Sequence, residues 1–72
     1  MPIIQSAADL GKAARAARKR LGITQPQLAL AAGVGVRFIV ELEAGKPSLR
    51  LSSALKVLDA LGGRFSVDGL ID

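Results

Sequence analysis

Four side chains between residues 36 and 41 combine apolar, cationic and anionic groups at a spacing that places them on one side of a helix. At about 100° per residue, the outward arc of this segment consists of Val36, Arg37, Val40 and Glu41. The opposite arc has the composition of a core face: Phe38, Ile39 and Leu42. A guanidinium donates paired hydrogen bonds, a carboxylate accepts them, and valine methyls make apolar contacts. We therefore expect the outward arc to contact another molecule.

The chain lacks the residues that most enzyme and metal sites require. Its 72 residues include neither Cys nor His. This excludes a His base, a Cys nucleophile, a disulfide framework and the commonest metal ligands. No spaced pair of carboxylates indicates a reaction either. We expect no enzymatic activity, no metal and no cofactor.

Hydropathy and composition indicate a small helical protein. Half of the residues are hydrophobic but only two are aromatic, so the core must use Leu, Ala, Val and Ile. No apolar run approaches the roughly 20 residues of a membrane-spanning helix. The first ten residues, MPIIQSAADL, lack the basic-then-apolar order of a signal peptide. We therefore expect a cytoplasmic protein without a membrane partner.

Positive charge is concentrated in the first half of the chain. The net charge is +4, but residues 1–37 hold six basic residues and one acidic residue. Residues 38–72 hold four basic and five acidic residues. Such an excess on one part of a small domain favours a polyanion partner. The alternative is a solvated basic face that maintains solubility.

Helix-capping signals predict two helices in the N-terminal half. Ser6 is a suitable N-cap, with Asp9 three residues later in an approximation of a capping box, and Gly22 ends this first helix. Thr24 and Gln27 repeat the pattern at the start of a second helix. The apolar positions of the first helix are Leu10, Ala14, Ala17 and Leu21, and its basic positions are Lys12, Arg15 and Lys19.

Two further helices and one strand are predicted in the C-terminal half. The third helix ends at about Ala44, before Gly45. A fourth begins at Ser48 or nearer Leu51 and is broken by residues 62–63. Its apolar positions are Leu51, Leu55, Leu58 and Leu61. RFSVDG, residues 64–69, alternates like a strand and needs a partner, either PIIQ at the N-terminus or another chain.

The second and third helices, joined by a short glycine-containing turn, have the size of a helix-turn-helix. The stretch ITQPQLALAAGVGVRFIVELEAGKPSL, residues 23–49, resembles the Cro/C1-type (XRE) helix-turn-helix family. The matching features, in order, are Thr24-Gln25, small Ala29, turn Gly33, buried Ile39 and Leu42, and the closing Glu43-Ala44-Gly45-Lys46. The resemblance extends over about residues 6–62 and implies an all-α, lambda-repressor-like fold of four helices.

The resemblance gives the outward arc a role as a recognition helix in the DNA major groove. Val36 and Val40 would contact thymine methyls, and Arg37 would reach guanine O6 and N7 or a phosphate. Glu41 would accept a hydrogen bond from cytosine N4, or else pair with Arg37 four residues earlier. Gly35 departs from the family pattern, in which Ser or Thr usually caps this helix.

The resemblance also implies supporting roles. The phosphate-contacting residues would be Thr24, Gln25, Gln27 and Lys46. Arg18 would pair with Glu43 and tie the first helix to the recognition helix. We expect Ala29 and Gly33 to be small because the two helices cross closely at the turn. We divide the chain into an N-terminal extension (1–5), a DNA-binding domain (6–62) and a C-terminal strand that forms a dimerisation tail (63–72).

Within the family, the domain followed by a glycine break and a short strand is most like the HipB-type antitoxins of type II toxin–antitoxin systems. This implies a homodimer whose tail strands pair through Phe65, Val67 and Leu70. It also implies an inverted-repeat operator, repression of the protein's own operon, and binding to a HipA-type kinase toxin. Two alternatives remain: a stand-alone XRE-family repressor, and a protein-interaction module that does not bind DNA.

Overall fold

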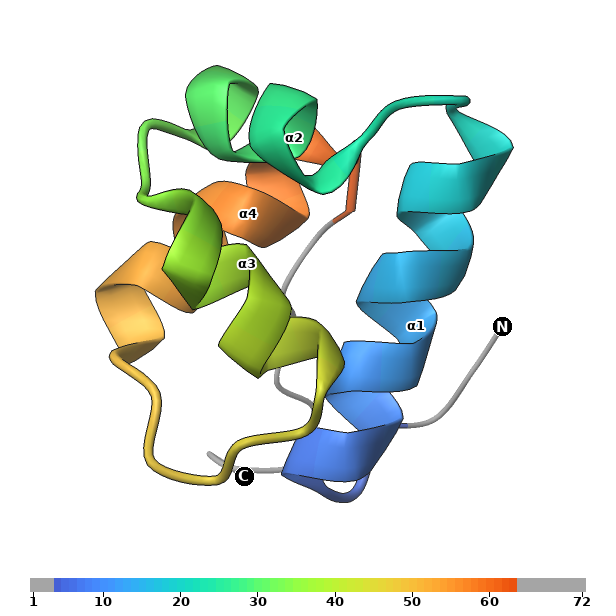
Figure 1. The fold of residues 1–72 in the computed structure, drawn as a ribbon. Coiled ribbons are helices and arrows are strands. Elements are labelled where there is room, and N and C mark those ends of the chain that lie inside the picture. The colour runs from blue at the N-terminus through green and yellow to red at the C-terminus, as the bar shows by residue number, and fades with distance from the viewer. Residues whose placement is uncertain (1–3, 64–72) are drawn as a thin grey trace, which may run out of the picture.

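The computed structural model describes residues 4–63, which form four helices (Figure 1). They are α1 (Ala7–Arg20), α2 (Gln25–Ala32), α3 (Val36–Glu43) and α4 (Leu51–Ala60). The predicted all-α, four-helix fold class is confirmed. None of the helices in this described part is long and apolar enough to cross a membrane. The predicted strand and the dimerisation residues Phe65, Val67 and Leu70 lie outside the described residues.

The first two helices begin where their capping residues predict. The Ser6 Oγ accepts a hydrogen bond from the Asp9 N–H at 3.1 Å, and the Asp9 carboxylate accepts one from the Gln5 N–H. Thr24 and Gln27 form a complete capping box, with each side chain accepting from the other residue's backbone N–H. These bonds satisfy N–H groups that have no partner within the helix.

α4 begins at the later of the two predicted starts. Its N-cap is Arg50, which has extended backbone angles and makes no side-chain capping bond. Leu49 packs against the core from the segment before the helix. The helix therefore starts only after Leu49 has reached the core, and Leu51 is the first helical residue.

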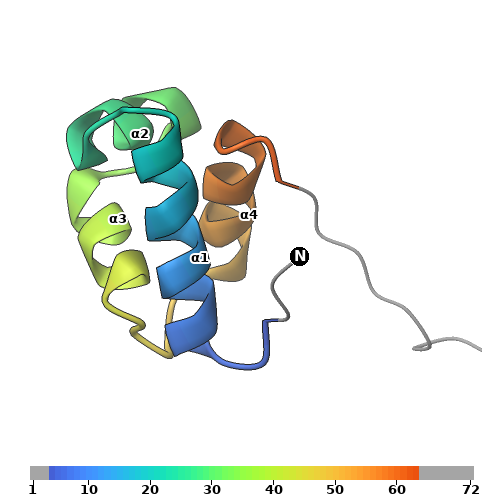
Figure 2. The same cartoon turned by 90° about the vertical axis from the view of Figure 1, so that its right-hand side faces the viewer.

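The core lies where the helices converge. Its fully buried large side chains are Leu28, Ile39, Leu42 and Val57, and small Ala14 and Ala29 join them. α3 packs against both α1 and α2, whereas α4 packs against α2. Seen from the α1 side, α2 and α3 lie to the left and α4 lies to the right (Figure 2). This arrangement leaves the outer face of α3 uncovered by the described helices.

Two predicted apolar stripes are only partly buried. Leu21 is exposed at the end of α1, and Leu51 and Leu55 are exposed on α4. The buried face of α4 is instead formed by Ala54 and Val57. The buried positions of α4 therefore hold smaller side chains than leucine, and Leu51 and Leu55 are left partly exposed to solvent.

Candidate functional site

The outer face of α3 carries the side chains predicted to share one arc. Val36 and Val40 are 45% and 47% exposed, and the Arg37 side chain is 90% exposed. Ile39 and Leu42, on the opposite side, are buried. The predicted division is confirmed for Val36, Arg37 and Val40 against Ile39 and Leu42, whereas Glu41 and Phe38 are each partly buried. The N-cap of α3 is Gly35, which has no side chain to make a capping bond, as the departure from the family pattern predicts.

The turn before α3 depends on one backbone conformation. Gly33, the C-cap of α2, has a φ of 73°, in the left-handed region that other residues rarely adopt. A Cβ built on Gly33 would meet no atom within 4 Å. The prediction that crowding between helices requires a small residue here is therefore wrong, because the backbone angle is what requires glycine. Ala29, in contrast, is buried in the core as predicted.

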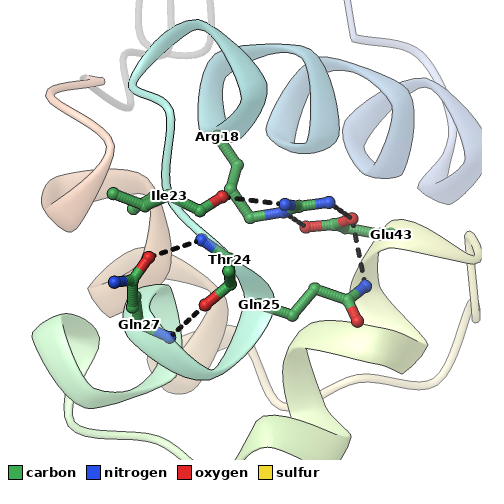
Figure 3. Close-up of polar contacts among 6 residues, drawn as sticks. All are labelled: Arg18, Ile23, Thr24, Gln25, Gln27 and Glu43. Carbon is green, nitrogen blue, oxygen red and sulfur yellow. Dashed lines mark hydrogen bonds and ion pairs between the residues drawn. The ribbon is translucent and has the colours of Figure 1, made fainter.

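Arg18 and Glu43 join α1 to the C-terminal end of α3, as predicted. Arg18 Nε donates to Glu43 Oε2 at 2.7 Å, and Nη2 donates to Oε1 at 3.0 Å (Figure 3). Nη1 donates to the Ile23 carbonyl at 2.9 Å, which adds the α1–α2 connection to the network. The two side chains are only 12% and 5% exposed. The guanidinium therefore fixes three separate segments at one point.

Glu43 also accepts a hydrogen bond from Gln25 Nε2 at 3.2 Å, so α2 joins the same network (Figure 3). Burial by itself raises the pKa of Glu43. Hydrogen bonds from Arg18 and Gln25, together with the charges of Arg18 and Arg15, outweigh burial and lower that pKa below its ordinary value. The hydrogen bond with Glu43 raises the pKa of Arg18. The network thus holds a full negative and a full positive charge at neutral pH.

Three residues predicted to contact phosphate lie together at the start of α2, and all have intramolecular partners. The Thr24 and Gln27 side chains are engaged in the capping box, and Gln25 bonds to Glu43. An amide NH₂ has two hydrogens, so Gln25 keeps one for another acceptor. Gln27 uses its oxygen towards Thr24, so its NH₂ is directed elsewhere. Phosphate contact by these residues stays a prediction.

Glu41 has a partner that sequence reasoning did not assign. Its Oε2 accepts a hydrogen bond from Lys46 Nζ at 2.9 Å, whereas the Arg37 Nε lies farther away, at 3.9 Å. The hydrogen bond from Lys46 is the main reason that the pKa of Glu41 lies below its ordinary value. Lys46, the fourth residue predicted to contact phosphate, is thus paired with a carboxylate on α3. The predicted base contact of Glu41 stays untested.

Gly11, in the middle of α1, is a positioning residue that sequence reasoning missed. A Cβ on Gly11 would collide with the carbonyl oxygen of Leu42 and lie 2.9 Å from that of Glu43. Backbone of α1 therefore lies directly against the end of α3. The sequence did contain a signal, namely a single glycine inside the predicted first helix. Such a glycine costs a helix about 1 kcal/mol relative to Ala, so its presence points to close packing.

The comparisons with known proteins agree with this geometry. A family model described as helix-turn-helix matches residues 15–67. The uncharacterized HTH-type transcriptional regulator y4mF of Sinorhizobium fredii (strain NBRC 101917 / NGR234) is 49% identical over 59 residues. The matched region covers 82% of this chain and 78% of that relative.

Two solved structures share the fold. A chain of a HipB-O4 20mer complex superposes with a TM-score of 0.86 at 24% identity, covering 99% of this chain and 100% of that chain. A chain of a HipA-HipB-O2-O3 complex gives a TM-score of 0.85 at the same identity and coverage. At this identity the likeness establishes a shared fold.

Proposed function

Because the chain belongs to the XRE-type helix-turn-helix family of transcriptional regulators, we propose that it is a repressor that binds double-stranded DNA sequence-specifically through α3. A recognition helix enters the major groove with its N-terminal residues towards the base edges. Arg37 is the second residue of α3 and can donate to guanine O6 and N7. Val36 and Val40 suit thymine methyls, and Glu41 suits cytosine N4.

The exposure of Arg37 on a firmly anchored helix is the observation that carries this proposal. The Arg37 side chain is 90% exposed, while the other side of α3 is buried and its end is bonded to Arg18 and Gln25. A base contact requires such a rigid support, because the donor must meet two acceptors of fixed geometry. A long cation on an anchored helix meets that requirement.

Backbone contacts to DNA would come from residues beside the recognition helix. Gln25 and Gln27 have side-chain amide N–H groups beyond those in their intramolecular bonds, and the backbone N–H of Gln25 opens α2. Lys46 follows α3, and Thr24 opens α2. These contacts would fix the register of the domain on the duplex without reading the sequence.

We further propose the domain division 6–62 for DNA binding and 63–72 for dimerisation. A two-fold dimer joined through Phe65, Val67 and Leu70 would hide apolar side chains that a chain of this size cannot cover alone. The operator would then be an inverted repeat with half-sites about 34–36 Å apart. The exposure of Leu51 and Leu55 on α4 offers a second apolar surface for the same contact.

A HipA-type kinase toxin is the proposed protein partner. Support comes from the fold shared with HipB in its complex with HipA and DNA, and from the HipB-like order of domain and tail. The alternative is a stand-alone repressor with the same DNA-facing residues. An adjacent reading frame for a kinase-like protein, and co-purification of the two products, would favour the antitoxin.

Selection of bound sites from random duplexes at a defined salt concentration tests the DNA-binding proposal. Arg37→Ala should weaken binding to the selected site by about 1–3 kcal/mol and relax preference at one base pair. Lys46→Ala should weaken binding to the selected site without relaxing its base preference, and it should reduce the slope of log K against log salt at that site by about one. If no site is enriched, and if the purified protein elutes alike with and without nuclease treatment, the alternative of a protein-interaction module that does not bind DNA would be favoured.

Truncation after Gly63 tests the dimerisation proposal. Sedimentation should then show a monomer or a much weaker dimer, and binding to the full operator should fall more than binding to a half-site. A truncated chain that stays dimeric at micromolar concentration would move the interface to the exposed leucines of α4.

A further inference from the structure

Glu41 is the outward-facing carboxylate of α3, and two cations lie beside it. It accepts a hydrogen bond from Lys46 Nζ at 2.9 Å, and Arg37 Nε is 3.9 Å away. The other carboxylate of α3, Glu43, is turned towards Arg18 and nearly buried. Two cations proposed to contact DNA therefore share one negative neighbour in the free protein.

Local helix stability does not explain a glutamate at position 41. The residue lies in the last turn of α3, where the helix dipole disfavours negative charge. An Arg followed four residues later by Glu is also the less favourable order for an ion pair on a helix. The carboxylate is ionised at neutral pH, and the hydrogen bond from Lys46 lowers its pKa below the ordinary value. Its charge is therefore stabilised from outside the helix by Lys46, which is also a proposed phosphate contact.

We infer that Glu41 is a specificity-determining residue, acting as an internal counter-ion that competes with DNA phosphates for Lys46. The inference rests on the proposed DNA-binding function. On any duplex a phosphate competes with Glu41 for Lys46, and a Lys46 that turns towards the phosphate leaves a carboxylate beside a polyanion. At the cognate site a base amino group replaces Lys46 as the donor to Glu41. At other sites no base donor replaces it, so non-specific binding is weakened selectively.

Counter-ion release sets the size of the effect. The logarithm of the binding constant falls by about 0.9 per neutralised phosphate for each tenfold rise in salt. A stranded Glu41 takes up a cation and cancels the release that Lys46 produces. Glu41→Gln should therefore tighten binding to random duplex about eightfold at 0.1 M salt and steepen its salt dependence by about one. Affinity for the selected site should rise by much less, because the variant also loses its base contact.

The experiment compares four proteins on the selected site and on random duplex across a salt series. They are the wild type, Glu41→Gln, the double variant Glu41→Gln/Lys46→Gln, and Asp59→Asn as the matched control. Asp59 is exposed on α4, so its replacement changes net charge equally on a different helix. Far-UV circular dichroism establishes that each variant is folded.

We expect an eightfold gain on random duplex for Glu41→Gln, a gain below about threefold when Lys46 is also replaced, and less than twofold for Asp59→Asn. Equal gains on both duplexes, or the same gain from Asp59→Asn, would overturn the inference. If the wild type selects a site and Arg37→Ala relaxes the base preference at that site, the proposed DNA-binding function survives the failure of this inference. If the wild type selects no site, the proposed function itself fails.

Discussion

Replacing Arg18 with methionine should destabilise the fold and weaken DNA binding, although Arg18 itself need not touch DNA. Methionine keeps most of the aliphatic stem and removes the guanidinium. Glu43 is then left nearly buried with Gln25 as its remaining hydrogen-bond donor, and the Ile23 carbonyl loses the Arg18 bond. The end of α3 loses its connection to α1, so α3 is held less firmly.

The structure bounds the size of this effect. Exposed ion pairs contribute about 0–1 kcal/mol, whereas removing one partner of a buried pair costs about 3–5 kcal/mol. Arg18 and Glu43 are 12% and 5% exposed at the edge of a small domain, so the pair lies between these cases. We expect a loss of about 2 kcal/mol in the free energy of unfolding. For a domain of this size that loss lowers Tm by about 8–16 °C.

Thermal unfolding followed by far-UV circular dichroism measures the loss. The chain has no Trp and no Tyr, so intrinsic fluorescence of those residues is not an option. All samples need one protein concentration, because the proposed dimerisation would link Tm to concentration. A Tm within 3 °C of wild type would refute the assignment of Arg18 as the residue that ties α1 to α3.

Charge exchange tests the coupling itself. Arg18→Glu alone should be more damaging than the methionine variant, because it places two carboxylates together. Adding Glu43→Arg should restore stability and operator affinity only in part. After the exchange, the carboxylate at position 18 cannot donate a hydrogen bond to the Ile23 carbonyl as Arg18 does. The guanidinium at position 43 would also lie near the positive charge of Arg15, which already acts on that position. Strictly additive effects of the two changes would show that the residues are not coupled.

Acid should destabilise the wild type, because the folded-state pKa of Glu43 lies below its unfolded value of about 4.3. That contribution is complete above the unfolded pKa and is lost as pH falls through the folded pKa, so Glu43→Gln should show a flatter decline in Tm between pH 5 and pH 2. Gly33→Ala should cost about 1 kcal/mol in urea unfolding, because the strain comes from backbone angle alone. Gly11→Ala should cost about 1–3 kcal/mol despite the better helix propensity of Ala, and it should also lower operator affinity in filter binding. Thr24→Ala should cost about 1 kcal/mol of unfolding free energy through loss of the capping bond.

The helices and the two faces of α3 were predictable because their signals are local. A capping box such as that of Thr24 and Gln27 involves residues three positions apart, and helical periodicity sorts Arg37 from Ile39 without knowledge of the rest of the fold. The Arg18–Glu43 pair was different. These residues are 25 positions apart, so only the family resemblance connected them.

Features set by packing between helices were not predictable in the same way. The leucines of α4 have a helical spacing, but so do Ala54 and Val57, and hydrophobicity alone favours the larger side chains. Which residues are buried depends on how α4 packs against its neighbours, and the structure buries the smaller pair. Gly11 shows the same limit, because its requirement arises from carbonyl groups of α3 more than 30 residues later in the chain.

Charge on the proposed DNA-facing side also depends on the fold. After α3 the chain turns so that Lys46 lies against Glu41. The two residues are five positions apart, a spacing that helical periodicity does not predict. Arg18 is likewise committed to Glu43. Lys46 and Arg18 both count as positive charges in the sequence, yet each is already paired with a carboxylate in the protein without DNA. Lys46 lies at the surface and can exchange its carboxylate for a phosphate, whereas Arg18 is nearly buried and cannot. Of these two cations, Arg18 supports α3, and Lys46 is the one for which we propose that Glu41 competes with DNA phosphates.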